Sequence, residues 1–559
     1  MNTTRRQLLV RVGMLGGVGL LAAACAPSPA APTAAPAAQP TPPPAKPAAT
    51  TAPAATTAPA AKPAATAAAT TAPAAAATTA PKPAARVPAG ELKVALPAKI
   101  VALDPHGAQS VEEVLHTSIQ HVMETLVKRD PSNNNIVPGL ATEWKTPDPM
   151  TWTFTLRNGV KYHDGSALTS ADVKAVVQRV IDAKGPVAPL FAQVDTVNTP
   201  NDSTVEIKTK VPVGTLLASM TLLPMAPASK VNEQGFFNKP IGTGPFKVVS
   251  WSPDADLRLE ANTEYWGGAP GLKNLTFRFY PEVAPMITAL ETGEVDFTWR
   301  LSPDQLPVLK GNSNIKIETV PGYTYFFVWM NSSREPFTDK RVRQAMAYAL
   351  DVDKMLNDLL PGVAKRGTAP IASTVFGHAP QTPYTYDPAK AKQLLADAGI
   401  RDGFDAGVIW NPGSGPQDRE LIQAMISYWN AIGVRIKSQE MERAVWIDNL
   451  VKLNWDLDFQ TNATTTGDAD FTLGRLYHSR ANRNGHKNPD LDKLLDDAVA
   501  TVDQNRRKEL YAQANKIIWD DAAGIFPFEL LNVYAYRTRV SGFVPSASPV
   551  LSFTPVTVS

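Results

Sequence analysis

The sequence predicts an α/β protein built from two lobes of different texture. About 470 of the 559 residues follow Gly90, and large apolar residues occur throughout this part, which is enough for two or three domains with cores of their own. Strand-like alternation dominates its first half, whereas helical spacing dominates from Phe337 onward. Short strand-like runs separate those helices, which favours a mainly parallel sheet in the second lobe.

The first 25 residues have the features of an export signal. Arg5 and Arg6 precede a short apolar run that ends in small residues at Cys25, the only cysteine of the chain. The run is too short and too rich in glycine to span a bilayer. The arginine pair resembles a twin-arginine signal, although Sec signals also carry such pairs. The residues before Cys25 resemble a lipobox, so we expect Cys25 to be lipidated and to anchor the mature protein outside the cytoplasm.

Residues 26–90 consist almost entirely of alanine, proline and threonine. Such a composition offers no large apolar side chains to offset the entropy of ordering, so we expect a disordered linker. Over the whole chain, 54 lysines and arginines nearly balance 52 aspartates and glutamates, and no second apolar stretch approaches the length of a transmembrane helix. The composition therefore indicates neither a nucleic-acid binder nor a membrane channel.

Two hairpins are predicted in the first half. Residues 151–157 alternate large apolar side chains with threonines, and Asn158-Gly159 follows at the position of a primed turn, so we expect pairing with residues 160–162. Residues 246–259 contain a second alternating pattern with an irregularity after Val248. Both patterns indicate strands that are buried on one face.

Capping residues predict where several helices begin and end. Thr169 and Asp172 have the spacing of a capping box, and Thr338 is placed to cap a helix early in the second lobe. Asp387-Pro388 is typical of a cap followed by the first helical residue, and Gly399 stands at the stop position of that helix. The strands expected between these helices are residues 407–410 and 434–437.

Several short motifs occur along the chain after residue 90. The longest are Gly-Leu-Ala-Thr-Glu-Trp at 139–144, the run 153–165 with its Asn-Gly and Asp-Gly pairs, and Gly-Thr-Gly-Pro-Phe at 242–246. Shorter ones are Leu-Asp-Pro at 103–105, Asn331 with Pro-Phe at 336–337, Arg-Val-Arg-Gln-Ala at 341–345 and Tyr-Asp-Pro-Ala-Lys-Ala at 386–391. Together these motifs resemble the family 5 extracellular solute-binding proteins, which include the oligopeptide-, dipeptide- and nickel-binding proteins of ABC importers. The resemblance extends from Leu92 to the C-terminus.

The resemblance implies a two-lobed periplasmic-binding-protein clamshell of type II, cluster C. Lobe I would comprise residues 91–331, with an extra subdomain at about 139–240, and residues 522–559 would return to it. Lobe II would comprise residues 332–521. A solute held between the lobes would favour the closed form. An ABC permease with its ATPase would recognise this closed form. In the alternative, the protein presents its ligand to a sensor instead of a permease. The protein would be a monomer without a cofactor.

The family also implies where a peptide would bind. In peptide-binding members an aspartate of the second lobe pairs with the free amino terminus, and Thr465 stands at the matching position. Its hydroxyl cannot supply that ion pair, so a peptide would lose a charge-assisted hydrogen bond, about 1.5 to 3 kcal/mol. A register shifted by three residues would give this role to Asp468. We expect a peptide or peptide-like solute, with an oligosaccharide or another non-peptide solute as the alternative.

Four further residues are candidates for contact with the ligand. Trp410 and Asn411 end the predicted strand 407–410, and loops at strand ends commonly meet ligands. The indole of Trp410 either stacks on a sugar or another flat ligand, or lies in the core. Tyr323 and Tyr325 share one face of a strand that precedes the second lobe, and that face meets either the cleft or the core.

The sequence indicates neither catalysis nor a metal site. It has no G-x-S-x-G or H-E-x-x-H motif and no phosphate-binding glycine loop, so we expect no enzyme. A secreted glycosidase that uses paired acids, such as those at 468–470, is the alternative from another class. His116 and His121 are five residues apart, and arginines surround His478 and His486, which opposes binding of a divalent cation.

Overall fold

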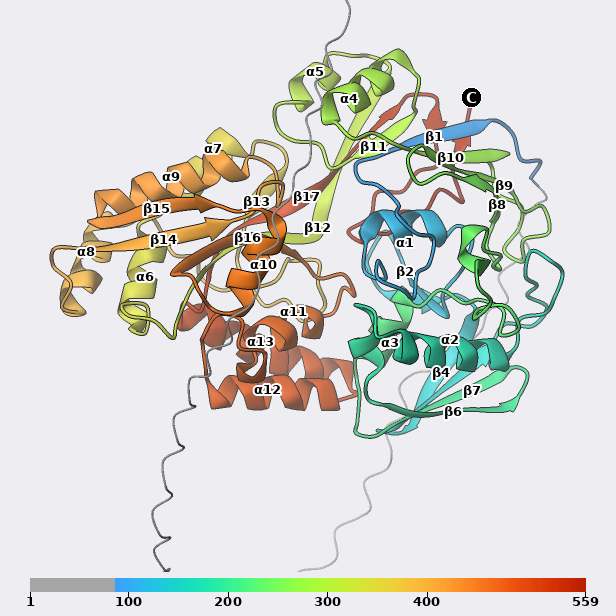
Figure 1. The fold of residues 1–559 in the computed structure, drawn as a ribbon, viewed down its shortest axis with the longest axis horizontal. Helices are drawn as coiled ribbons and strands as arrows, with labels where there is room; N and C mark the ends of the chain where they lie inside the picture. Colours follow the sequence, from blue (N-terminus) through green and yellow to red (C-terminus); the bar gives the residue numbers. More distant parts are fainter. Residues whose placement is uncertain (1–85) are drawn as a thin grey trace, which may run out of the picture. The chain divides into compact units, whose positions relative to one another are not determined.

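The computed structural model describes residues 86–559 (Figure 1). The predicted signal peptide, the lipidation site at Cys25 and residues 26–85 of the predicted linker lie outside the described residues. Among residues 86–559, no helix combines the length and the apolar character needed to cross a bilayer.

A mixed sheet runs through the described part in the order β15-β14-β16-β12-β17-β11-β1-β10-β9-β8, with β13 attached to β17. Its two central strands, β12 (Ile315–Met330) and β17 (Ile525–Arg537), pair antiparallel and lie side by side in Figure 1. The other strands are β1 (Glu91–Leu96), β8 (Phe246–Trp251), β9 (Asp256–Ala261), β10 (Asn274–Phe279), β11 (Phe297–Trp299), β13 (Ala364–Arg366), β14 (Phe404–Trp410), β15 (Val434–Glu440) and β16 (Leu457–Ala463).

The fold is a two-lobed α/β fold, in which β12 and β17 belong to both lobes. We use lobe I for the elements before β12 together with the residues after β17, and lobe II for the elements between these two strands. The predicted boundary at 331/332 lies at the C-terminal end of β12, and that at 521/522 lies just before β17. The chain therefore passes between the lobes along two adjacent long strands.

Lobe I combines its half of the mixed sheet with a separate sheet of order β4-β5-β7-β6. That second sheet and α2 fall within the predicted extra subdomain at 139–240. Besides its strands of the mixed sheet, the elements of lobe I are α1 (Glu113–Ile119), β2 (Val127–Arg129), β3 (Ile136–Pro138), β4 (Ala141–Asp148), β5 (Thr151–Leu156), α2 (Ser170–Ala183), η1 (Ala188–Phe191), β6 (Val194–Asn201), β7 (Thr204–Thr209), α3 (Leu216–Ser219), η2 (Met220–Leu222), η3 (Phe236–Asn238), α4 (Val283–Thr292), α5 (Leu306–Lys310), β18 (Val540–Ser541) and β19 (Thr557–Val558).

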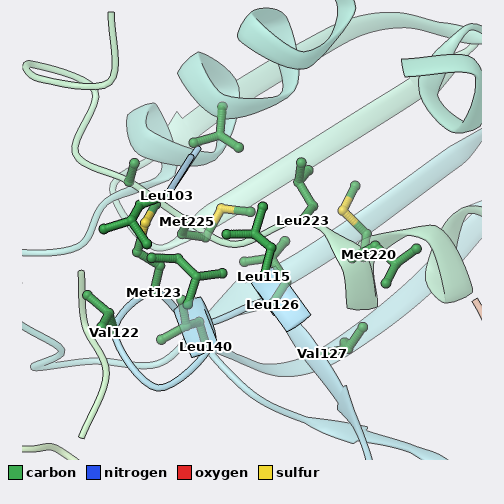
Figure 2. Packing of buried hydrophobic residues seen from close by; sticks show 14 of the residues in the cluster. Leu103, Leu115, Val122, Met123, Leu126, Val127, Leu140, Met220, Leu223 and Met225 are labelled. Atoms are coloured by element: carbon green, nitrogen blue, oxygen red, sulfur yellow. The ribbon is translucent and has the colours of Figure 1, made fainter. Parts of the chain in front are cut away.

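The core of lobe I joins segments that are far apart in the sequence. Figure 2 shows Leu115 of α1 close to Leu126 and near the side chains of Leu223 and Met225. Burial of such side chains is worth roughly 1.5 to 3 kcal/mol each before the entropy of ordering is counted. The labelled side chains in this part of the core are Leu103, Leu115, Val122, Met123, Leu126, Val127, Leu140, Met220, Leu223 and Met225.

Lobe II is built on β14, β15 and β16, which run parallel, and β16 then pairs antiparallel with β12. Alternate residues of β12 face two different cores, with Phe326 and Val328 on one side and Phe327 and Trp329 on the other. The helices of lobe II are α6 (Lys340–Tyr348), α7 (Val352–Leu359), α8 (Pro388–Asp397), α9 (Asp418–Ala431), α10 (Arg443–Val451), α11 (Asp470–Tyr477), η4 (Ser479–Ala481), α12 (Pro489–Ala500) and α13 (Gln504–Asp520).

Most of the predicted helix ends are confirmed. Thr169 and Asp172 form the capping box of α2, and the Asp387 side chain accepts a hydrogen bond of 2.8 Å from the amide of Lys390 at the start of α8. The cap predicted at Thr338 is wrong by one residue. Asp339 has the extended backbone of an N-cap, and its carboxylate accepts from the Arg341 amide at 2.8 Å.

One hairpin prediction is confirmed and the other is wrong. β8 and β9 pair across residues 246–261, with a register shift after Val248. β5 pairs instead with β4 on one edge and β7 on the other, so no edge is free for residues 160–162. Of those residues, Lys161 makes only an isolated bridge with Ala167.

Candidate functional site

The two lobes touch at more than one place, one of them where the Gly214 amide of lobe I donates to the Val499 carbonyl of lobe II at 2.6 Å. At another, a turn of lobe II, residues 464–468, approaches residues 129–134 of lobe I. Arg129 donates from Nη2 to the carbonyl of Thr466 and from Nη1 to the carbonyl of Asn134, the latter at 2.9 Å. The Asn134 amide in turn donates to the carbonyl of Thr374 in lobe II at 2.8 Å. The Tyr323 hydroxyl, on β12, donates to Asn134 Oδ1. Hydrogen bonds thus connect both lobes and a shared strand at one place.

Gly467 allows this close approach. Its φ of +68° lies in the left-handed region, which favours glycine. A Cβ on this residue would lie 2.7 Å from the Tyr323 hydroxyl oxygen and 2.9 Å from Cζ of Arg129. A side chain at this position would therefore push lobe I and β12 away from the turn.

Thr465 lies in this turn and is half-buried. The hydroxyls of its two neighbours bond within lobe II, since Thr464 pairs with Thr472 at 2.8 Å and Thr466 accepts from the Asp468 amide at 3.2 Å. The Thr465 hydroxyl makes no hydrogen bond to any of residues 86–559. Its donor and acceptor are thus available to a ligand at the lobe junction.

Asp468 is engaged inside lobe II. Its carboxylate forms a bidentate ion pair with Arg507 at 2.8 and 2.9 Å, and the two side chains are only 6% and 1% exposed. The same carboxylate accepts from the Asp470 amide at 3.2 Å. These contacts contradict the alternative prediction that Asp468 binds a ligand amine, because its negative charge is already compensated by a buried guanidinium. They also leave no free acid at 468 for a glycosidase pair.

Trp410 lies in the core of lobe II. It is 2% exposed, and its indole Nε1 donates to Ser438 Oγ at 3.0 Å. The neighbouring Asn411 is half-buried and donates to the carbonyl of Met441 at 3.1 Å. Both side chains bond to residues at or after β15. Of the two interpretations of Trp410, the structure favours the core position over stacking on a ligand.

Tyr323 and Tyr325 lie on the same face of β12 and are 2% and 1% exposed. Burial raises the pKa of Tyr323 to about 12, although the charge of Arg129 opposes this shift. Burial also raises the pKa of Tyr325 well above its usual range, so both phenols keep their protons near neutral pH. Tyr323 uses its proton on Asn134, whereas the Tyr325 hydroxyl lies beside Tyr477 and Asn462 without a hydrogen bond of good geometry among the described residues.

Tyr325 belongs to a row of four polar residues that crosses the sheet at the shared strands. The strand register places Asn462 of β16, Tyr325 of β12, Glu529 of β17 and Lys365 of β13 opposite one another in turn. Opposite residues of antiparallel strands share one face, so we call these four residues the hinge row. Sequence reasoning identified only Tyr325. The signal for Glu529 is a charged residue inside the long apolar run of β17.

Glu529 carries the buried negative charge of the hinge row. It is 2% exposed, and its Oε2 lies 3.2 Å from Lys365 Nζ without the geometry of a hydrogen bond. Lys365 instead donates to Ser373 Oγ at 2.6 Å, and its side chain is 39% exposed. No other residue among 86–559 donates a hydrogen bond to Glu529 Oε2.

The histidines considered as metal ligands bond to other groups. His116 and His121 are buried, and each has a ring nitrogen against a backbone carbonyl, that of Ser110 at 2.8 Å and that of Thr117 at 2.7 Å. Residues 86–559 hold no cluster of three His, Cys, Asp or Glu side chains arranged to bind a metal ion.

Comparison with known proteins agrees with this architecture. Residues 135–484 match the family model described as bacterial extracellular solute-binding proteins, family 5 Middle. The chain is 28% identical to the glutathione-binding protein GsiB of Pectobacterium atrosepticum over 486 residues, covering 83% of this chain and 93% of that protein. It is 27% identical to the probable D,D-dipeptide-binding periplasmic protein DdpA of Escherichia coli over 482 residues, covering 82% and 92%.

A solved structure extends this similarity to the fold. The dipeptide-binding protein of Pseudoalteromonas sp. SM9913, in complex with Met-Leu, superimposes with a TM-score of 0.71 at 25% identity, over 84% of this chain and all of that one. The two-lobed α/β fold and the contacts between its lobes together identify the class of the protein as a two-lobed binding protein. The chain belongs to the bacterial extracellular solute-binding proteins, family 5. Members of this family are extracytoplasmic solute-binding proteins, and two of the relatives named above are described as binding glutathione and a dipeptide.

Proposed function

We propose that this protein captures a peptide or peptide-like solute between its lobes and delivers it, unconverted, to an ABC permease. The observation that carries the proposal is the meeting of Gly467, Arg129 and Tyr323, which come from lobe II, lobe I and a shared strand, with the predicted contact Thr465 in the same turn as Gly467. A solute at this place touches both lobes, so its binding stabilises the form in which they are close. The names of GsiB, DdpA and the Met-Leu complex support a peptide-like solute.

The shared strands supply the hinge of the proposed mechanism. Their register shifts between Pro321 and Tyr325 and again between Phe326 and Val328. Such irregularities break the regular ladder of hydrogen bonds and allow a strand pair to bend. The first shift contains Gly322, whose absent side chain leaves room for Asn532, because a Cβ would lie 2.5 Å from Asn532 Oδ1. We infer that the lobes open and close by bending here.

We propose that the mature protein acts as a monomer held at the outer face of the cell membrane by a lipid on Cys25. The alanine-, proline- and threonine-rich residues 26–90 would then serve as a tether. A tether of this kind keeps the binding lobes at high local concentration near a membrane permease while allowing them to search the space around it. Mass spectrometry of the mature N-terminus tests the lipid on Cys25.

The proposed ligand class predicts selective stabilisation. We expect short peptides to raise the melting temperature of the purified protein, because a ligand that binds only the folded form adds RT ln(1 + [L]/Kd), about 2.7 kcal/mol at 100 times the Kd. Oligosaccharides at equal concentration serve as the control. Stabilisation by oligosaccharides alone, or turnover of the stabilising solute, contradicts the proposal. Mass spectrometry of solute retained through purification gives an independent identification.

The hinge predicts compaction on binding. We expect small-angle X-ray scattering to give a smaller radius of gyration with saturating peptide than without it, because a ligand that contacts both lobes shifts the population toward the closed form. An unchanged scattering curve at saturation contradicts bending at the shared strands. The scattering of protein mixed with a peptide that does not raise the melting temperature is the control.

A further inference from the structure

We propose that Glu529 receives the cationic amino group of the ligand, with the Tyr325 hydroxyl oxygen as its neighbouring acceptor. This inference rests on the proposed function and specifies the chemistry of the same site. It places amine recognition on the shared strands β12 and β17 instead of on the turn at 464–468. The ligands selected are solutes with a free primary amine, and peptides with an unblocked N-terminus are the simplest of these.

The first argument is the state of the two oxygens. Glu529 Oε2 and Tyr325 Oη are buried, and neither makes a hydrogen bond of good geometry among residues 86–559, although Lys365 Nζ lies 3.2 Å from Glu529 Oε2 and Tyr477 and Asn462 lie beside Tyr325. A buried carboxylate oxygen without a donor is costly, and native proteins rarely leave one unsatisfied. Their residues lie directly opposite each other on antiparallel strands, so both side chains stand on one face of the sheet. An ammonium group has three donors and can satisfy both oxygens at once.

The second argument is position. Tyr323 precedes Tyr325 by two residues on the same face, and its hydroxyl bonds to Asn134 of lobe I. Next to it, the carbonyl of Gly322 accepts from Thr374 Oγ1 at 2.6 Å, and the carbonyl of Thr374 accepts from Asn134. Tyr325 of the hinge row is therefore only two residues along β12 from Tyr323, which contacts lobe I at the lobe junction. A ligand bound at the lobe junction would place its amino group beside β12 and β17, the two strands at which we infer that the lobes bend.

The third argument is the charge of the other residues that could bind a ligand amine. Thr465 is neutral, and the carboxylate of Asp468 is compensated by Arg507. Asp458, four residues before Asn462, accepts from the Trp446 indole at 2.8 Å, and burial raises its pKa to about 7, which weakens it as an anion. Glu529 is the carboxylate of the hinge row and combines burial with a free acceptor oxygen.

The cationic side chains near Glu529 can be displaced from it by the ammonium group of a ligand. Lys365 is its nearest cation, but that ammonium is partly exposed and has Ser373 as a second partner. Lys365 can turn toward solvent and Ser373 when a ligand ammonium takes its place, so the buried Glu529 carboxylate keeps a cation beside it throughout the exchange. Burial lowers the pKa of His378, against the opposing effect of the Glu529 charge, so this imidazole is no competing cation near pH 7. Arg475 is engaged by Asn462 Oδ1 at 2.8 Å.

The test compares free-amino dipeptides and tripeptides with their N-acetylated forms by isothermal titration calorimetry. For the unchanged protein we expect free-amino peptides to bind about 10- to 100-fold more tightly, the range of a hydrogen-bonded charge pair. Glu529→Gln keeps the shape of the side chain and removes its charge, so this preference should fall to about twofold or less. Glu509→Gln, on an exposed face of α13, is the matched control and should keep the full preference.

Lys365→Gln gives a second test with the opposite sign. Removing the competing ammonium should strengthen binding of free-amino peptides and leave the affinity for acetylated peptides unchanged. If the ion pair between Lys365 and Glu529 were purely structural, Lys365→Gln and Glu529→Gln would both bind free-amino and acetylated peptides more weakly. An unchanged preference in Glu529→Gln overturns the inference while peptide binding itself stands. If free-amino and acetylated peptides both fail to bind the unchanged protein, the proposed function fails and the inference falls with it.

Discussion

Replacing Arg507 by alanine is expected to lower the free energy of unfolding by about 3 to 5 kcal/mol. Arg507 is fully buried in α13, where it holds both carboxylate oxygens of Asp468 and also donates to the Ala498 carbonyl at 3.1 Å and the Tyr511 hydroxyl at 3.0 Å. Alanine leaves the Asp468 charge buried without a partner, and an uncompensated buried charge is among the most destabilising changes in a protein. Urea unfolding followed by circular dichroism measures the loss.

The neighbouring arginine provides a matched control. Arg506 is 55% exposed and pairs with Glu509 at 2.8 Å on the surface of the same helix. Arg506→Ala removes the same side chain and is expected to cost less than about 1 kcal/mol, because exposed ion pairs are screened by water and salt. Equal losses in the two variants would mean that the buried pair with Asp468 contributes nothing special to the fold.

The Arg507 pair also explains why the turn at 464–468 is well placed to meet lobe I. Asp468 ends this turn, and its amide bonds back to Thr466, whose carbonyl is the acceptor for Arg129. Gly467 and Ala469 are further held by backbone bonds to Phe376 at 3.0 and 2.9 Å. A buried ion pair at one end therefore fixes the surface that the other lobe touches. Loss of this pair should weaken peptide binding as well as stability.

Local signals in the sequence predicted local structure well. A cap depends on side chains within three or four residues of the helix start, so the capping box of Thr169 with Asp172 and the cap at Asp387 before Pro388 could be identified from the local sequence alone. The hairpin expected after residue 159 failed for a different reason. Which strand pairs with β5 depends on which edges are free, and β4 and β7 occupy both. Strand pairing is a property of the whole sheet.

The candidate site shows the same division. The face shared by Tyr323 and Tyr325 follows from the two-residue period of a strand and is found in the structure. The partners of Asp468 and Glu529 lie 39 and 164 residues away along the chain, at Arg507 and Lys365, so no local pattern reveals whether either charge is free. The hinge row exists only because the register of four strands aligns its members.

Replacing Trp410 by alanine is expected to lower the free energy of unfolding by about 3 to 5 kcal/mol. The side chain is 2% exposed at the end of β14, its strand pairs on both sides, and its indole bonds to Ser438. Alanine would leave a large cavity in the core of lobe II. Trp144, which is half-buried on β4 in lobe I, is the control, and its replacement by alanine should cost clearly less.

Trp410→Phe separates a structural role from a role in ligand binding. Phenylalanine keeps an aromatic ring but lacks the indole Nε1 and some volume, so we expect a smaller loss of stability and an unchanged Kd for peptide in the folded protein. The Kd is measured by calorimetry well below the melting temperature of the variant. A stability like that of the unchanged protein together with a peptide affinity reduced tenfold or more would contradict the core position. Such a result would mean that the ring leaves the core to meet the ligand, which would require β14 to shift against β15 and break the bond to Ser438.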